Sequence, residues 1–386
     1  MSFTDWTRQF LAHEAKLVSL LQPRSYYLEN FLHSVSVISD PSNGIFYVYP
    51  VIAALFSPSR SLSFDMMLIG SILSWLSMLL KWIFSGERPF WWIREIAQTF
   101  PNVPVLRQMH NTCVANPGFP SSHVMVNSGI LLVLVDAILS RKSSTSQPSR
   151  FSPTPWYSSM LKWGCWGFYL GLLLIVMLSR VYNSAHFPHQ CIWGATLGAY
   201  VANKISFSWN EEWRRKQKPW KMFALSLAPI LIAVASYWIQ KGLGIDPQRA
   251  VHLAFKWCFS PHDISVRTTP VYYLTCCCGC MFGLGVALLL QRMAAKFFAH
   301  GHISSRDSTL YLLYGKNSSL FNVVHAIGIF ASACLLFKLQ NQIPTDTVTV
   351  FYFHHFALNF AAPFLYYAFV PIILKVISVK LKLKKD

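Results

Sequence analysis

The chain has 386 residues, of which 53% are hydrophobic, 15% aromatic and only 12% charged. Soluble domains average about 25% charged residues, so this composition excludes an ordinary soluble protein and indicates a polytopic membrane protein. The formal net charge is +18. The Lys and Arg residues lie in short clusters between apolar segments, which is typical of a membrane-topology signal and argues against nucleic-acid binding.

Apolar segments long enough to cross a bilayer predict an all-α bundle of about nine transmembrane helices, in a single domain covering residues 1–386. The spans are expected near residues 31–57, 62–83, 121–140, 157–179, 187–208, 220–240, 270–291, 319–338 and 349–378. The stretch from Ser39 to Gly44 interrupts the first span, and its Asp-Pro and Asn-Gly pairs predict a break or kink. The N-terminal segment lacks the pattern of a cleaved signal peptide, so the first span is expected to direct insertion.

The connections between these spans differ in their content of basic residues. Most of the 33 Lys and Arg residues fall on one side, which contains Arg60, the loop at 141–150, the stretches 204–221 and 292–316, and the C-terminal tail. The positive-inside rule places that side in the cytosol, the C-terminus with it, and the N-terminus in the lumen or outside the cell. The acceptor sequence Asn317-Ser318-Ser319 then lies in the cytosol, and no glycan is predicted there.

Two cations end the second span, Lys81 and Arg88, seven residues apart. On a continuous helix this spacing returns to nearly the same face after two turns, so both side chains could converge on one anion. Either residue alone could instead snorkel to the membrane interface. Phe90, Trp91 and Trp92 follow; they could line a sugar site, but such aromatics more often form an interfacial belt.

The third span opens with Pro120, Ser121, Ser122 and His123. Pro and Ser favour a helix start, and the free N–H groups and positive dipole end of a helix N-terminus favour phosphate. The simpler interpretation is an ordinary helix cap that carries a histidine. Taken alone, this segment leaves both interpretations open.

The fourth span ends with Arg180, and His186 follows six residues later. An arginine fork can hold phosphate oxygens and a neutral imidazole can attack phosphorus, so the pair fits phosphoryl transfer. An interfacial Arg beside a structural histidine is the simpler alternative. His189 is a rival nucleophile. By the parity of the spans, all three polar segments face the same compartment, which favours a shared site.

The nine cysteines show no spacing typical of a disulfide-rich secreted scaffold or a zinc site. Cys276, Cys277, Cys278 and Cys280 lie within an apolar segment, and we interpret them as small packing residues.

The segments KWIFSGERPFWW, NPGFPSSH and SRVYNSAHFPHQ occur in this order. Together they resemble the signature of the acid phosphatase and lipid phosphate phosphatase superfamily, and more narrowly the glucose-6-phosphatase catalytic subunits. Further similarities are SVISD near Asp40, KGLGID at Lys241, and AFKWC followed by the turn at Thr268 and Thr269. The resemblance covers nearly the whole chain and implies the same number of spans.

The resemblance implies a role for each residue of the three motifs. His186 would be the nucleophile that forms a phosphohistidine, and His123 would protonate the departing sugar oxygen and then activate water. The phosphoryl oxygens would be held by Lys81, Arg88, Arg180, Ser121 and Ser122. No metal or cofactor is needed for this division of roles.

Two positions depart from the superfamily pattern. Ser122 replaces the usual glycine, so an added side chain lies beside the expected phosphate. Gln190 replaces the aspartate that orients the nucleophile in many members, although the glucose-6-phosphatase branch resembles this chain there. An amide oxygen can accept a hydrogen bond from the imidazole and fix its tautomer without a charge.

The expected substrate is glucose 6-phosphate, hydrolysed to glucose and phosphate at a lumenal site in the endoplasmic reticulum membrane, as the last step of gluconeogenesis and glycogenolysis. A separate sugar-phosphate transporter is implied as a functional partner, because the substrate is made in the cytosol. The terminal lysines Lys382, Lys384 and Lys385 resemble a dilysine retrieval signal or serve as a positive-inside anchor. The alternatives are a lipid phosphate phosphatase, a weakly active or non-catalytic homologue, and an anion transporter.

Overall fold

The computed structural model describes residues 3–56, 60–97, 103–109, 111–144, 155–208, 218–298, 319–343 and 347–383. Within these ranges the chain forms helices and no β-strand, so the predicted all-α class is confirmed. The chain forms two compact units. Unit 1 comprises Met1–Pro41, Leu76–Ala202 and Ala233–Tyr273, and unit 2 comprises Ser42–Trp75, Asn203–Ile232 and Leu274–Asp386. The single domain expected from the sequence stays a prediction.

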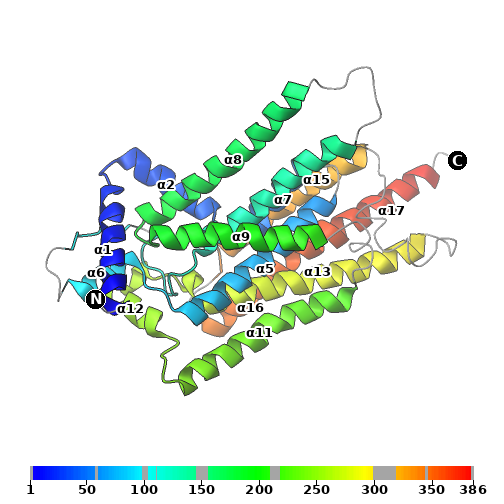
Figure 1. Ribbon diagram of the computed structural model, residues 1–386. Helices are drawn as coiled ribbons and strands as arrows, with labels where there is room; N and C mark the ends of the chain where they lie inside the picture. Colours follow the sequence, from blue (N-terminus) through cyan, green and yellow to red (C-terminus); the bar gives the residue numbers. More distant parts are fainter. Residues whose placement is uncertain are drawn as a thin grey trace. The chain divides into compact units, whose positions relative to one another are not determined.

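Unit 1, whose helices are labelled in Figure 1, holds all the residues of the predicted site. Its complete α-helices are α1 (Phe3–Leu20), α2 (Tyr26–Ile38), α6 (Pro89–Ile96), α7 (Ser122–Ser144), α8 (Pro155–Tyr182) and α12 (Arg249–Trp257). Two 3-10 turns follow α12, η2 (Pro261–Asp263) and η3 (Val266–Thr268). Besides the short helix at Pro41–Asn43, four longer helices contribute segments to both units: α5 (Arg60–Phe84), α9 (Pro188–Ser208), α11 (Pro219–Gly242) and α13 (Pro270–Phe298).

Unit 2 begins with the short helix α3 (Pro41–Asn43), the π-helical turn η1 (Gly44–Val48) and α4 (Tyr49–Phe56). Its C-terminal part contains α15 (Ser319–Gln340), α16 (Val348–Phe364), the π-helical turn η5 (Leu365–Phe369) and α17 (Val370–Leu383). The predicted interruption of the first span is confirmed, because α2 ends at Ile38 and a proline begins the next helix.

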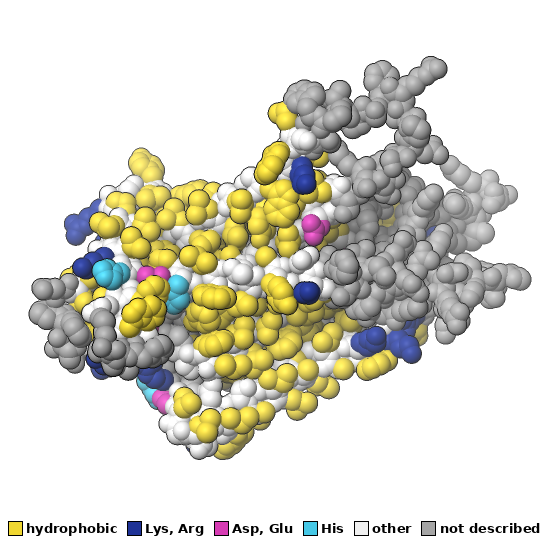
Figure 2. Space-filling model, viewed as in Figure 1, with side chains coloured by type: hydrophobic (Ala, Val, Ile, Leu, Met, Phe, Trp, Pro, Cys, Tyr) yellow, Lys and Arg dark blue, Asp and Glu magenta, His cyan; other side chains and the backbone are white. Residues whose placement is uncertain are grey.

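Seven helical segments among the described residues are long and apolar enough to cross a membrane: Leu62–Ile96, Ser122–Leu139, Ser159–Tyr182, Pro219–Gly242, Pro270–Ala294, Phe321–Gln340 and Val348–Ile377. They match seven of the nine predicted spans. The predicted first span is divided among short helices, and α9 is less apolar than the rest. Figure 2 shows apolar side chains spread over the exposed flanks of the helices. On α8 they include Trp163, Phe168, Leu170 and Leu174, which fits contact with lipid.

Two glycines bring α9 against the start of α7. A Cβ atom at Gly194 would lie 2.8 Å from the carbonyl oxygen of Ser121. A Cβ atom at Gly198 would overlap the carbonyl oxygen of Met125. Small residues four apart allow this close approach of two helix backbones. As a result, the loop that precedes α9 lies beside the N-terminus of α7. The segments NPGFPSSH and SRVYNSAHFPHQ meet there.

A disulfide joins Cys113, in the loop before α7, to Cys258, directly after α12. This disulfide was not predicted from the sequence, because two cysteines 145 residues apart leave no spacing pattern. The interpretation of the cysteine cluster is confirmed: Cys276, Cys277, Cys278 and Cys280 form no disulfide and are buried in α13.

Removing this disulfide is expected to destabilise the protein. For a closed loop of this length the loss of chain entropy in the unfolded state predicts about 4 to 5 kcal/mol. The double substitution of Cys113 and Cys258 by serine should therefore lower the midpoint of thermal unfolding in detergent. Cys334→Ser, at an exposed free cysteine, is the matched control. Equal midpoints for the two variants would contradict the stabilising role.

Candidate active site

The eight residues predicted for the site come together in unit 1, and each is at most 8% exposed. They come from the end of α5, the N-terminal ends of α6, α7 and α9, and the last turn of α8. Buried cations and histidines are costly without partners, so each of these groups needs hydrogen-bonding contacts within the site.

The side chain of Gln190 fixes the orientation of His186. Its Nε2 donates to the carbonyl oxygen of Glu87 at 2.6 Å, so its Oε1 must face the opposite way. That oxygen lies 3.1 Å from His186 Nδ1 and accepts from the backbone N–H of Phe187 at 3.2 Å. An acceptor at Nδ1 keeps the proton on that nitrogen and leaves the lone pair on Nε2. This is the geometry required of a nucleophilic imidazole.

Arg88 lies against the other side of the His186 ring. Its Nη1 is 3.4 Å from His186 Nε2 and donates to the carbonyl oxygen of Ala185 at 2.5 Å. Its Nε and Nη2 donate to oxygens of Asn116 and Pro117. Four of the five N–H groups of the guanidinium therefore point to oxygens of neighbouring segments, and the fifth faces the imidazole.

Lys81 and Arg88 converge by a different route from the one expected. The helix is not continuous between them: α5 ends at Phe84, and Ser85 adopts a left-handed φ of 44°. Arg88 is the N-cap residue of α6. Lys81 Nζ donates to the carbonyl oxygen of Pro117 at 2.6 Å, and Arg88 Nη2 contacts the same oxygen. The loop before α7 therefore brings the two cations together.

The pKa of His186 lies well below its ordinary value. Burial is the largest cause, and the nearby charges of Arg88, Lys81 and Arg180 lower it further. The imidazole is therefore neutral at pH 7, as a nucleophile requires.

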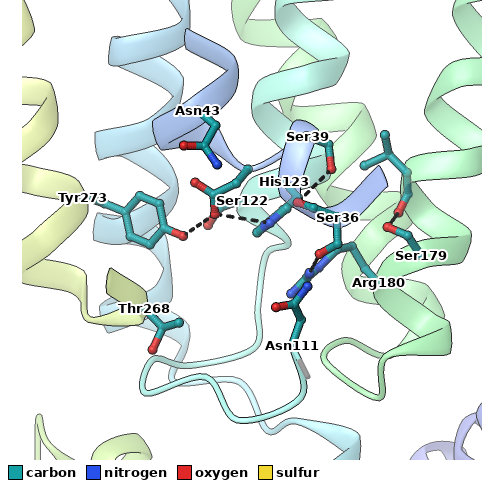
Figure 3. A network of polar contacts seen from close by, with 12 residues as sticks. Ser36, Ser39, Asn43, Asn111, Ser122, His123, Ser179, Arg180, Thr268 and Tyr273 are labelled. Atoms are coloured by element: carbon teal, nitrogen blue, oxygen red, sulfur yellow. Dashed lines mark hydrogen bonds and ion pairs between the residues drawn. The ribbon is translucent and has the colours of Figure 1, made fainter. Parts of the chain in front are cut away.

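His123 contacts a carboxylate that the site prediction did not include. Its Nε2 lies 3.4 Å from Asp40 Oδ2, which also accepts from the hydroxyl of Tyr273 at 3.0 Å. His123 and Tyr273 are labelled in Figure 3. Asp40 belongs to the SVISD segment and precedes the proline that breaks the first predicted span. An acid at membrane depth was the available signal, because ionisable residues there are costly unless they serve the site.

Arg180 reaches the same region from the last turn of α8. Its Nη1 donates to the hydroxyl of Ser36 at 2.5 Å, as Figure 3 shows. Its Nε is buried and has no hydrogen-bond partner among the described residues. Arg180 therefore retains a charged donor that can bind an anion.

Ser121 and Ser122 lie where the sequence predicts a helix start, because α7 begins at Ser122. The backbone N–H of Ser121 donates to the carbonyl oxygen of Gln190 at 3.1 Å, which joins α7 to α9. The hydroxyl of Ser122 is 3.0 Å from that of Ser77. The serine at the usual glycine position is thus accommodated by a second serine on α5.

Gly118 maintains the orientation of Gln190. A Cβ atom at this position would lie 2.3 Å from the carbonyl oxygen of Glu87 and 2.9 Å from both amide atoms of Gln190. Gly118→Ala should therefore displace the amide and lower the rate of phosphate release about a hundredfold, the range for a misplaced reacting group. Gly164→Ala is the control, because nothing lies within 4 Å of its Cβ position. Unchanged release by the Gly118 variant would contradict this account.

His189, the rival nucleophile, has a different environment. Its Nδ1 lies 2.5 Å from Glu14 Oε2, and its ring stacks with Phe119 and Phe187. Its backbone N–H donates to Glu14 Oε1 at 2.9 Å. Among the described residues, His189 thus contacts α1 and two aromatic rings, which fits a structural role.

The segment after α1 also supports the nucleophile loop. Gln22 Nε2 donates to the carbonyl oxygen of Tyr182 at 2.6 Å and to the hydroxyl of Ser184 at 2.8 Å. Ser184 has a left-handed φ of 51°, a conformation that needs support in a residue other than glycine. No local pattern indicates this contact, because it joins residues about 160 positions apart.

Phe90, Trp91 and Trp92 are not lipid-facing belt residues, so the interpretation preferred from the sequence was wrong. All three are buried in unit 1. Trp91 Nε1 donates to Glu87 at 2.9 Å, and the rings of Trp92 and Phe187 meet edge to face. They pack behind the loop that presents Arg88.

Comparisons with known proteins identify related sequences. Residues 63–215 match the PAP2 superfamily. The chain is 30% identical to human glucose-6-phosphatase 2 over 353 residues, which cover 90% of each chain. It is 33% identical to glucose-6-phosphatase catalytic subunit 1 of Haplochromis nubilus, over 71% of this chain and 74% of the relative.

Mouse glucose-6-phosphatase 3 is 32% identical, over 70% of this chain and 74% of the relative. No solved structure matches the chain at a significant level. The matches cover both the motifs and most of the chain outside them, and their names and the PAP2 domain indicate phosphatase chemistry. The chain is therefore a phosphoric monoester hydrolase and belongs to the glucose-6-phosphatase family.

Proposed function

We propose that this protein hydrolyses glucose 6-phosphate to glucose and inorganic phosphate through a phosphohistidine on His186. The observation that carries the proposal is the orientation of this ring. Gln190 accepts a hydrogen bond from His186 Nδ1, and the unprotonated Nε2 of His186 faces Arg88. The similarity to glucose-6-phosphatases over most of the chain supports the choice of sugar phosphate.

In the first step, Nε2 of His186 attacks phosphorus and the bond between phosphorus and the sugar oxygen breaks. His123 gives its proton to that oxygen, and Asp40 stabilises the charged form of the ring. In the second step, His123 takes a proton from water, which attacks the phosphohistidine and releases phosphate. Lys81, Arg88 and Arg180 stabilise the negative charge of the transferring group.

The site faces the lumen of the endoplasmic reticulum in this proposal. The distribution of basic residues supports that orientation. The Cys113–Cys258 disulfide supports it too, because disulfides persist in the lumen and are rare in the cytosol. A lumenal site needs a transporter to deliver the cytosolic substrate, and the reaction would complete gluconeogenesis and glycogenolysis. The predicted glycan-free Asn317 and most of the lysine-rich tail lie outside the described residues.

The substrate is tested with microsomes that contain the protein, by measuring phosphate release from glucose 6-phosphate, mannose 6-phosphate and phosphatidic acid. We expect the glucose ester to be hydrolysed with the highest kcat/KM. Hydrolysis of phosphatidic acid alone would overturn the sugar assignment and favour a lipid phosphate phosphatase.

The orientation predicts where a glycan can be attached. Asp263→Asn completes an Asn-X-Ser acceptor with Ile264 and Ser265, in an exposed turn after α12. This variant should gain an endoglycosidase-sensitive glycan in cells, whereas the natural acceptor at Asn317 should carry none. A glycan at Asn317, or none on the Asp263 variant, would contradict a lumenal site.

A further inference from the structure

Asn116 holds Arg88 by two different groups. Its carbonyl oxygen accepts from Arg88 Nε at 2.7 Å, and its side-chain Oδ1 accepts from Nη2 at 2.6 Å. The residue is 3% exposed. Two acceptors on one residue fix both the position and the rotation of the guanidinium plane, because a planar fork bound at two nitrogens cannot turn about its own axis.

The amide of Asn116 has only one possible orientation. Its Nδ2 donates to the carbonyl oxygen of Thr268, at the end of η3, so Oδ1 must face Arg88. The neighbouring backbone N–H of Ala115 donates to the hydroxyl of Thr268 at 3.0 Å, and that hydroxyl donates to the carbonyl oxygen of Ser265 at 2.7 Å. The Cys113–Cys258 disulfide attaches the same loop to the same segment covalently.

We infer that Asn116 is a positioning residue for Arg88, a role that rests on the proposed phosphoryl transfer at His186. With Nε and Nη2 held, the remaining freedom of the guanidinium is removed, and an Nη1–H stays directed toward His186 Nε2. In the transition state phosphorus takes up the lone pair of that nitrogen, so this N–H then donates to a phosphoryl oxygen beside it, and its direction matters most there. Neither hydrophobicity nor motif spacing distinguishes Asn116 from an ordinary turn residue before proline.

Asn116→Ala is expected to lower kcat about tenfold and to change KM less than kcat, since an interaction strongest in the transition state is lost. It should also weaken the binding of orthovanadate, measured as the concentration dependence of thermal stabilisation of the detergent-purified protein. The matched control is Gln108→Ala. Gln108 is an amide of the same loop that bonds to Asp263 and to the backbone of Phe259, and it does not contact Arg88.

A double-substitution cycle with Arg88→Lys tests whether Asn116 acts through Arg88. Lysine lacks the fork that Asn116 orients, so adding Asn116→Ala to Arg88→Lys should cost less than twofold further in kcat and in vanadate affinity. A purely structural role would give multiplicative losses. Multiplicative losses, an equal loss in the Gln108 control, or a wild-type kcat in Asn116→Ala would each overturn the inference.

Asn116→Asp is the test variant if the alanine variant does not fold. Its carboxylate keeps the acceptor for Arg88, loses the donor to the carbonyl oxygen of Thr268 and adds negative charge near the substrate, so kcat should fall less than in the alanine variant while KM rises. A kcat as low as that expected for alanine would count against positioning through the acceptor.

The assays use p-nitrophenyl phosphate beside glucose 6-phosphate. Wild-type protein that binds vanadate and hydrolyses only the nitrophenyl ester would refute the proposed substrate, while the cycle still decides the role of Asn116.

Discussion

His186→Ala is expected to abolish phosphate release, with a fall in kcat of at least about a thousandfold, as for removal of a covalent nucleophile. Alanine leaves no atom at the position of Nε2, which the structure directs toward Arg88. His189→Ala is the matched control. That histidine is three residues away and bonds to Glu14, so its loss should lower activity far less.

The same pair of variants tests the covalent intermediate. Briefly incubated with radiolabelled substrate and quenched in alkali, wild-type protein should retain acid-labile phosphate on histidine, and His189→Ala should retain it too. His186→Ala should retain none. Label on His189, or full activity without His186, would refute the assignment of the nucleophile.

The long helices could be predicted because twenty apolar residues have few alternatives to spanning a bilayer. The break after Ile38 was equally visible, since Asp40 and Pro41 do not continue a helix. The short helix α12 and the Cys113–Cys258 disulfide were not predicted. Their stability comes from tertiary contacts between distant segments, which no local periodicity encodes.

The site also contains residues that could be predicted from the sequence and contacts that could not. His123, Arg180 and His186 stand in motifs whose residue types already indicate phosphoryl transfer. Asn116 contacts Arg88, and Asp40 contacts His123 from a segment far away in the sequence; only the fold reveals these contacts. The case of Arg88 shows that a correct expectation can rest on wrong geometry. A shared helix face was assumed, but α5 ends at Phe84 and the left-handed Ser85 follows before α6 begins.

His123→Ala should show how much proton transfer to the leaving group lowers the activation barrier for cleavage of the phosphate ester. Glucose departs as a poor alkoxide and needs a proton, whereas p-nitrophenolate leaves without one. The variant should therefore lose about a thousandfold in kcat on glucose 6-phosphate, within the range for general acid catalysis. Formation of the phosphohistidine from p-nitrophenyl phosphate should be affected much less.

Hydrolysis of the phosphohistidine gives an independent test of proton transfer by His123. Without His123 no base activates water, so the phosphohistidine formed from p-nitrophenyl phosphate should accumulate, visible as a burst of nitrophenolate equal to the enzyme concentration. Asp40→Asn keeps the histidine but removes the charge near its Nε2, and it should give a smaller loss with the same dependence on the leaving group. Equal losses in the rate of phosphohistidine formation from the two substrates would instead assign His123 to phosphate binding, because binding is shared by the two esters and proton donation to the leaving group is not.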